Sequence, residues 1–328
     1  MVKTLKDSAL PQMATSAFLF PGQGAQVVGM GASLRKGSPA AAAVFEKANA
    51  LLGFDLAALC ETGPQSELDR TDIAQPAIYV VSCAALAAMA EKGRNGTAVV
   101  PAFAAGLSLG EFTALHYAGA FSFEDGLRLV RKRGQLMQQA AEATPGGMVS
   151  VLGLDEAKVR ELCGEASAAV GGKLLVPSNF LCPGNIVLSG DKDACRVAAE
   201  LAEKKYSVKA IPLAVAGAFH TAHMTPAGEG LSAALAATAL SQPRIPVIAN
   251  ATAEAHPGVG ELPALLVRQL DGPVLWEQSM RRLLDSGVEL FYEIGPGRVL
   301  AGLLKRIQRS AKVVNLQTAE DVAALSAK

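Results

Sequence analysis

The chain has 328 residues, of which half are hydrophobic, so it can form one large α/β domain with an insertion or two ordinary domains. Its 30 basic and 30 acidic residues give a net charge of zero. This balance excludes the strongly basic surface typical of nucleic-acid-binding proteins, and any electrostatic recognition must depend on a local patch.

The predicted elements begin with a polar N-terminal arm at 1–15. A short apolar run at 17–20 then ends in Pro21-Gly22, as a buried parallel strand does where it enters a loop. The pattern of the next hundred residues predicts further helices and one strand. These are Ala/Leu-rich helices at about 38–60 and 75–93, a buried strand at 98–108 with a helix after it, and a helix at 125–142 with its charges on one face.

From about residue 145 the pattern becomes β-α-β-β-α-β, which is typical of a small ferredoxin-like unit. Its strands are predicted at 148–154, 173–180, 185–190 and 208–215, with helices at 156–170 and 193–205. Buried strands return at 246–252 and 290–296. The sequence therefore predicts a parallel α/β core interrupted by an inserted ferredoxin-like α+β subdomain. The expected divisions are an arm (1–15), a catalytic domain (16–144 and 214–317), an insert (145–213) and a tail (318–328).

A serine elbow follows the second core strand. The segment Gly106-Leu107-Ser108-Leu109-Gly110 has the pattern G-x-S-x-G between a predicted strand and a helix that Glu111 opens. In that context the serine hydroxyl is a nucleophile, and the helix N-terminus favours negative charge on a substrate oxygen. The alternative is a glycine-rich turn with an ordinary capping serine.

A second glycine-rich loop, FPGQGAQ at 20–26, follows the first strand. Its spacing fits neither G-x-x-x-x-G-K-[ST] nor G-x-G-x-x-G, so a phosphate site is not indicated. We interpret the loop as supplying the backbone N–H of Gln23, directed at the same oxyanion as the N–H of Leu109.

A serine nucleophile needs a base, and His220 at the end of LAVAGAFH is the favoured one of four histidines. His223 stays open as an alternative, whereas His116 and His256 are interpreted as solvated or packed bystanders. The His220–His223 pair has no neighbouring Cys or second ligand pair, so no metal site is expected.

The five scattered cysteines include no C-x-x-C pair, which favours reduced thiols over disulfides. No long apolar run precedes Pro11, so a signal peptide is not expected. Nor do we expect any segment to reach the roughly 20 apolar residues that span a bilayer. These features predict a soluble cytoplasmic protein without a nucleic-acid or membrane partner.

Several motifs occur in one order along the chain: GQGAQ (22–26), GLSLGE (106–111) and AFH (218–220). With them the sequence, from about Phe18 to Gln317, resembles the malonyl-CoA:acyl carrier protein transacylases, which are related to the acyltransferases of polyketide synthases. Further matching segments are TDIAQPAIYV (71–80), RKRGQLMQ (131–138), SNFLCPGNIVLSG (178–190), VRQLDGPVLW (267–276) and YEIGPGRVLAGLLKRI (292–307).

The resemblance implies an α/β-hydrolase-like core and a malonyl transferase with an acyl-serine intermediate, supplying fatty acid synthesis. It implies malonyl-CoA as donor, an acyl carrier protein as partner, no permanently bound cofactor, and a monomer. The implied catalytic residues are Ser108 as nucleophile, His220 as base, the backbone amides of Gln23 and Leu109 as oxyanion donors, and the carbonyl of Gln269 as the group that orients the base.

The resemblance also implies a substrate pocket formed by Arg133, Phe219, Asn179, Asn185, Gln75 and Met148. Arg133 matches the arginine that binds the malonyl carboxylate; composition alone would make it a surface residue of the run RKR. A buried guanidinium would have no partner in a neutral acyl chain, whereas a carboxylate can pair with it bidentately. Phe219 matches a malonyl-selecting pattern, and its ring should crowd a 2-methyl substituent. The chain departs from the family at Leu107, where a histidine is usual, and near Leu181, where a polar residue is usual.

Acyl carrier proteins are acidic, so we expect a local basic docking patch. The candidates are Lys204, Lys205, Lys209, Lys305, Arg306 and Arg309. Three alternative functions remain: a trans-acting acyltransferase of a polyketide pathway, a thioesterase or hydrolase on the same elbow, and a non-catalytic carrier-binding protein.

Overall fold

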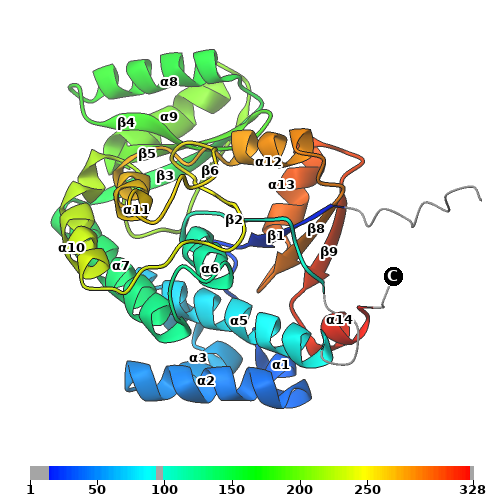
Figure 1. Cartoon of the computed structure of the whole chain (residues 1–328). Coiled ribbons are helices and arrows are strands. Elements are labelled where there is room, and N and C mark those ends of the chain that lie inside the picture. Colours follow the sequence, from blue (N-terminus) through cyan, green and yellow to red (C-terminus); the bar gives the residue numbers. More distant parts are fainter. Residues whose placement is uncertain (1–14, 94–98, 326–328) are drawn as a thin grey trace, which may run out of the picture.

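The computed structural model describes residues 15–93 and 99–325, so nearly all of the predicted arm at 1–15 lies outside the described residues. The large domain contains a five-stranded sheet in the order β7-β2-β1-β8-β9, in which every neighbouring pair is parallel (Figure 1). Its strands are β1 (Ser16–Phe20), β2 (Phe103–Gly106), β7 (Val247–Ile248), β8 (Leu290–Ile294) and β9 (Lys312–Leu316). The predicted parallel α/β core is confirmed.

Alternate side chains of β1 enter two different hydrophobic cores, because successive residues of a strand point to opposite faces. Phe18 and Phe20 belong to the core built with helices α5 (Thr71–Lys92) and α7 (Phe123–Ala143). Ala17 and Leu19 belong to the core built with α12 (Trp276–Asp285) and α13 (Val299–Ile307). The central sheet is therefore covered by helices on both faces, which explains why its strands are continuously apolar.

The expectation that no segment is long and apolar enough to span a bilayer is wrong for helix α5. Its 22 residues could cross a membrane by length and composition alone. In the structure 83% of its most apolar 18-residue window is buried inside the protein, against α2 (Pro39–Leu52), α6 (Leu109–Tyr117) and α7 among others. The helix is apolar on all sides because other helices surround it, so its composition reflects a position in the core.

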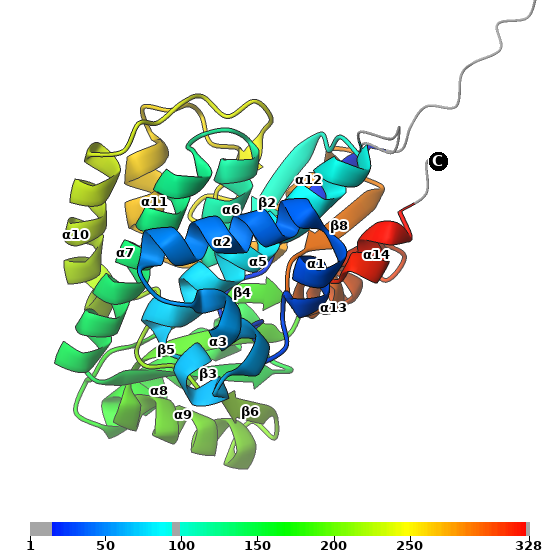
Figure 2. The same cartoon turned by 90° about the horizontal axis from the view of Figure 1, so that it is seen from below.

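The predicted helical region at 38–60 is divided into two helices, α2 (Pro39–Leu52) and α3 (Leu56–Thr62). Gly53 ends α2 with a φ of 75°, a left-handed conformation that glycine adopts readily. Figure 2 shows α2 lying along α5, and α14 (Ala319–Ala323) beside α1 (Ala32–Gly37). The segment expected as a tail thus contains a packed helix. The short α4 (Gln65–Leu68) precedes α5.

The insert forms a separate antiparallel sheet in the order β4-β5-β3-β6, with α8 (Glu156–Ala169) and α9 (Lys192–Lys204) packed on one face. This is the predicted ferredoxin-like unit. Its strands are β3 (Gly146–Leu152), β4 (Leu175–Cys182), β5 (Asn185–Asp191) and β6 (Lys209–Pro212). Val149 and Val151 enter its own core, whereas Met148 belongs to the core of the large domain. One face of the small sheet therefore packs on the large domain.

The strand at the sheet edge, β9, was missed in the sequence. Its residues Lys312 to Asn315 are exposed or half-buried and include two polar side chains, so the apolar run that marks a core strand is absent. Conversely, β2 and β7 are shorter than predicted. The chain leaves β2 at Gly106 for the serine elbow, and it leaves β7 after Ile248 for a tight turn in which the N–H of Ala249 donates to the carbonyl of Glu254.

Candidate active site

Three loops meet at one edge of the central sheet because they follow three parallel strands, whose carboxyl ends lie at the same edge. The loop with Gln23 follows β1, the elbow with Ser108 follows β2, and the turn with Asn250 follows β7. Since β1, β2 and β7 are neighbours in the sheet, segments far apart in the sequence converge on the serine.

The glycines of the first two loops allow this convergence. A Cβ atom on Gly22 would lie 2.4 Å from the carbonyl oxygen of Leu107, and one on Gly110 would lie 2.1 Å from that of Phe20. A Cβ on Gly106 would lie 1.9 Å from the carbonyl carbon of Gly110. The spacing G-x-S-x-G is therefore required by backbone contacts within the elbow itself and between the elbow and the end of β1.

Ser108 has the strained backbone of a nucleophile elbow, with φ 50° and ψ −105°. A non-glycine residue at positive φ costs about 1–3 kcal/mol and persists only where its surroundings hold it. Here the Ser108 N–H donates to Asn250 Oδ1 over 2.6 Å. The partly exposed side chain has its Oγ 3.0 Å from His220 Nε2 and 3.0 Å from Arg133 Nη2.

His220 lies in the segment between β6 and the short 3-10 helix Ala222–Met224, and it is held by helix α11 (Leu262–Asp271), which carries Gln269. Its Nδ1 lies 2.7 Å from the carbonyl oxygen of Gln269, which can only accept, so Nδ1 carries the proton and Nε2 is free to accept from Ser108. Burial and, after it, the nearby Arg133 cation lower the pKa of His220 to about 4, although the hydrogen bond to the carbonyl of Gln269 acts in the opposite direction. The imidazole is therefore neutral, as a base must be.

The lowered pKa of His220 predicts how the acylation expected at Ser108 depends on pH. Because the pKa is lowered, protonation removes the base only below about pH 4, instead of near the usual 6.5. We expect the second-order rate constant of acylation to keep about 90% of its neutral-pH value at pH 5 and to fall about tenfold per unit below pH 4. Stopped-flow measurement of the acylation rate constant from about pH 3 to about pH 8 tests this expectation, and circular dichroism checks that the protein stays folded at each pH. An acid limb near pH 6.5 in folded protein contradicts the assignment.

The other histidines lie elsewhere. His116 Nδ1 is 3.2 Å from the carbonyl of Phe121, and His223 Nε2 is 3.8 Å from Asp191. His256 is buried, with its Nε2 2.8 Å from Glu111 Oε1. Of the four histidines, which all lie in the described part of the chain, only His220 is hydrogen-bonded to Ser108.

The two predicted oxyanion donors belong to the loops that meet at Gly22. Among the described residues, the backbone N–H groups of Gln23 and Leu109 have no hydrogen-bond acceptor. Leu109 N–H belongs to the first turn of α6 (Leu109–Tyr117), where such groups lack partners within the helix. Both can therefore donate to a substrate oxygen.

Arg133 is 1% exposed and projects from α7 to the serine. Its guanidinium donates to Gln75 Oε1 (2.7 Å), Gln269 Oε1 (2.9 Å) and Ser108 Oγ. All three acceptors are neutral, and Arg133 Nε has no partner in the described part of the chain. Burial lowers the pKa of Arg133 to about 10, so it stays charged at neutral pH. A buried cation without a directly bonded carboxylate is prepared for an anionic ligand.

Hydrogen bonds join some of the predicted pocket residues to this centre, and others bond elsewhere. Gln75 bonds Arg133 directly, and Phe219 precedes His220 and is buried in the large core with Met148. Asn179 accepts from Ser178, and Asn185 accepts from Ser150 on the small sheet. No hydrogen bond joins either asparagine to the serine, base or arginine in the described residues, so their place in the pocket stays a prediction.

Three residues near the serine were not assigned from the sequence: Glu111, Asn250 and His256. Asn250 Nδ2 donates to the carbonyl of Gly106, and its backbone N–H donates to Glu111. Glu111 was interpreted only as the start of a helix, and the segment containing Asn250 as a strand. The signal was weak because the partners are more than one hundred residues apart in the sequence.

The acyl transferase domain family matches residues 17–325, and the chain belongs to this family. It is 39% identical over 310 residues to the malonyl CoA-acyl carrier protein transacylase of Bacillus subtilis (strain 168), covering 94% of this chain and 96% of that relative. It is 46% identical over 291 residues to polyketide biosynthesis protein ThaF of Burkholderia thailandensis, covering 89% of this chain but 24% of ThaF. A solved complex of a type II polyketide synthase acyl-carrier protein with its malonyl-transacylase matches with a TM-score of 0.88 at 35% identity, over 95% of this chain and 99% of that one.

Proposed function

We propose that the protein transfers a malonyl group from malonyl-CoA to the phosphopantetheine thiol of an acyl carrier protein, through an acyl-serine intermediate. The observation that carries the proposal is the buried, charged Arg133, whose guanidinium lies 3.0 Å from the hydroxyl of Ser108. A cation at that distance matches an acyl group with a carboxylate near its thioester. The similarity to malonyl CoA-acyl carrier protein transacylases supports the same substrate.

In the first half-reaction, Ser108 Oγ attacks the thioester carbonyl while His220 Nε2 takes the proton of the Ser108 hydroxyl. The N–H groups of Gln23 and Leu109 donate to the resulting oxyanion. The carbon–sulfur bond then breaks, and the imidazolium protonates the departing coenzyme A thiolate. The carbonyl of Gln269 stabilises the imidazolium by accepting from Nδ1 throughout.

Substrate binding should also help the base. The Arg133 cation disfavours protonated His220 in the free protein. When a malonyl carboxylate pairs with the guanidinium, that positive charge is neutralised, and proton transfer to His220 becomes easier.

In the second half-reaction the carrier thiol gives its proton to His220 and attacks the carbonyl of the acyl-serine. The bond between the acyl group and Ser108 Oγ then breaks, and His220 returns the proton to Ser108. The protein's own residues supply each of these steps.

The direct test is intact mass after incubation with malonyl-CoA, followed by addition of a phosphopantetheinylated acyl carrier protein. We expect a malonyl adduct on the protein, which the carrier then removes as malonyl-carrier forms. Adduct loss as free malonate, at the same rate with and without carrier, would indicate a hydrolase instead. Parallel incubations with acetyl- and methylmalonyl-CoA test the selectivity expected from Phe219, where crowding of this kind is worth about 1–3 kcal/mol.

A second candidate is supply of a polyketide pathway in place of fatty acid synthesis. It is favoured by the 46% identity to ThaF, a polyketide biosynthesis protein. The chemistry at Ser108 is the same, and only the carrier differs. Transfer rates to a fatty-acid-type carrier and to a polyketide-type carrier separate the two. We place either reaction in the cytoplasm.

Of the proposed carrier-docking residues, those on α13 and just after it suit an acidic partner better. Lys204 already pairs with Glu200, and Lys205 already pairs with Glu165, which reduces the attraction of these lysines for an acidic carrier protein. Lys305, Arg306 and Arg309 are exposed and form no ion pair with another described residue. Lys209, on β6, is exposed as well.

A charge reversal on α13 should therefore weaken carrier transfer. We expect Lys305→Glu with Arg306→Glu to raise the KM for carrier about tenfold and to reduce its salt dependence, while acylation by malonyl-CoA is unchanged. Reversal of Lys204 and Lys205 is the matched comparison, with a smaller expected effect. The placement of the carrier on α13 is contradicted if both charge reversals raise the KM for carrier equally, or if the α13 reversal leaves it unchanged.

A further inference from the structure

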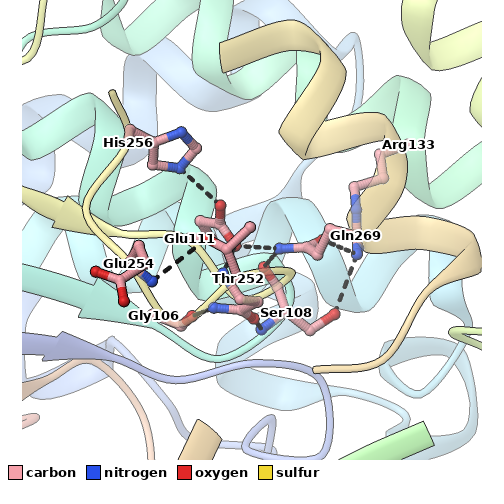
Figure 3. Close-up of polar contacts among 9 residues, drawn as sticks. Gly106, Ser108, Glu111, Arg133, Thr252, Glu254, His256 and Gln269 are labelled. Atoms are coloured by element: carbon pink, nitrogen blue, oxygen red, sulfur yellow. Dashed lines mark hydrogen bonds and ion pairs between the residues drawn. The ribbon is translucent and has the colours of Figure 1, made fainter. Parts of the chain in front are cut away.

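Glu111 is a fully buried carboxylate three residues after the serine that the proposed chemistry does not use. Both of its oxygens are engaged (Figure 3): Oε1 lies 2.8 Å from His256 Nε2, and Oε2 accepts from the backbone N–H of Asn250 (2.9 Å) and from Gln269 Nε2 (2.7 Å). A backbone N–H and an amide NH₂ can only donate. A group that receives this set of donors acts as an acceptor-only carboxylate, and His256 then carries its proton on Nε2.

The carboxylate determines which way the Gln269 side chain points. In the observed orientation, Nε2 donates to Glu111 and to the carbonyl of Ser108 (2.9 Å), and Oε1 accepts from Arg133. A flipped amide would place its oxygen against two acceptors and its NH₂ against the guanidinium. Glu111 therefore helps to present an acceptor to Arg133. The same residue, Gln269, holds His220 by its backbone carbonyl.

A second branch reaches the elbow. Glu111 accepts a hydrogen bond from the backbone N–H of Asn250. The Asn250 side chain in turn accepts from Ser108 N–H (2.6 Å) and donates to the carbonyl of Gly106 (2.7 Å). These bonds hold the serine at its positive φ. Glu111 also supplies negative charge: it opposes the lowering of the Arg133 pKa that burial causes. One amide, that of Gln269, joins the buried cation to the buried anion.

We infer that Glu111 is a positioning residue of the transfer reaction, aligning the arginine and the base through Gln269 and the nucleophile through Asn250. The hydrogen bonds of its carboxylate within the described chain go to Asn250, Gln269 and His256, and none goes to a reacting atom. The inference rests on the proposed malonyl transfer, and it adds that selectivity for a carboxylate depends on a residue behind the elbow.

The test compares Glu111→Gln and Glu111→Ala for acylation of Ser108 by malonyl-CoA and by acetyl-CoA. Glu111→Gln can keep an oxygen toward Asn250 and Gln269 if His256 changes tautomer, but it loses the charge. We expect kcat/KM for malonyl to fall about tenfold in Glu111→Gln and about 100-fold in Glu111→Ala, since small misplacements have effects of this size. The acetyl rate should fall at least threefold less, because acetyl makes no use of Arg133.

Glu293 provides the matched control. It is also fully buried. Its carboxylate accepts from Leu300 N–H and Ala301 N–H at the start of α13 and from Asn315 Nδ2 on β9. Glu293→Gln and Glu293→Ala should lower the melting temperature but leave the malonyl-to-acetyl ratio unchanged. The inference is overturned if the Glu111 variants keep the wild-type ratio, or change it only as the Glu293 variants do. If Glu111→Ala does not fold, the ratio in Glu111→Gln decides. Absence of a malonyl adduct in the wild-type protein would instead contradict the proposed function.

Discussion

Replacing Ser108 with alanine is expected to abolish malonyl transfer, lowering the rate by about 10³-fold or more, because the acyl group loses the oxygen to which it is attached. The alanine keeps the backbone N–H that bonds Asn250, and it removes only the Oγ that lies near His220 and Arg133. The fold should therefore persist. Covalent labelling with radioactive malonyl-CoA, measured after denaturation, reports the acyl-enzyme directly.

Ser279 offers a matched comparison for this prediction. It is a buried serine on α12, outside the active site, whose hydroxyl donates to the carbonyl of Leu275. Ser279→Ala should keep wild-type labelling. Persistent covalent labelling of Ser108→Ala would place the acyl group on another residue and remove the basis of the mechanism.

Replacing Arg133 with alanine is expected to separate malonyl from neutral acyl groups. Loss of a buried partner of a charged group costs about 2–5 kcal/mol, which corresponds to a fall of about 30- to 5,000-fold in kcat/KM for malonyl-CoA. The acetyl rate should change much less and can rise relative to malonyl, since a neutral acyl group leaves the buried guanidinium unpaired. Initial rates of coenzyme A release with the two thioesters give the ratio.

The same variant has a second expected effect. Removing the cation relieves its influence on His220, so the acid limb of acetyl transfer should move upward from about pH 4 toward the usual value of 6.5. Arg131→Ala on the same helix is the control, because Arg131 donates to the carbonyl of Asp72 and does not contact the serine. Equal losses of malonyl and acetyl transfer in Arg133→Ala would mean that the residue supports the fold and does not bind the carboxylate.

Much of the fold followed from local patterns. The apolar runs around Phe18 and Phe291 predicted buried parallel strands, and the β-α-β-β-α-β order predicted the inserted sheet, since strand and helix periodicity are properties of neighbouring residues. The edge strand β9 was missed because four of its five residues are exposed or half-buried and two of these are polar, so no apolar run marks it. Helix α5 looks like a membrane span by composition, and only its surroundings identify it as a core helix.

For the site, the motif G-x-S-x-G at 106–110 was enough to predict the elbow. Glycine is required at positions 106 and 110 because the backbone of Ser108 turns sharply against the loop after β1. The motifs that resemble malonyl transacylases pointed in addition to His220 and Arg133. How these groups are held depends on the three-dimensional arrangement: Asn250 bonds the serine, Gln269 lies between base and arginine, and the Glu111 carboxylate bonds both Asn250 and Gln269. These three partners lie on three segments, which are the turn after β7, α11 and α6. The turn after β7 meets the elbow because the parallel strands align their carboxyl ends, and no local pattern specifies a contact between residues so distant along the chain.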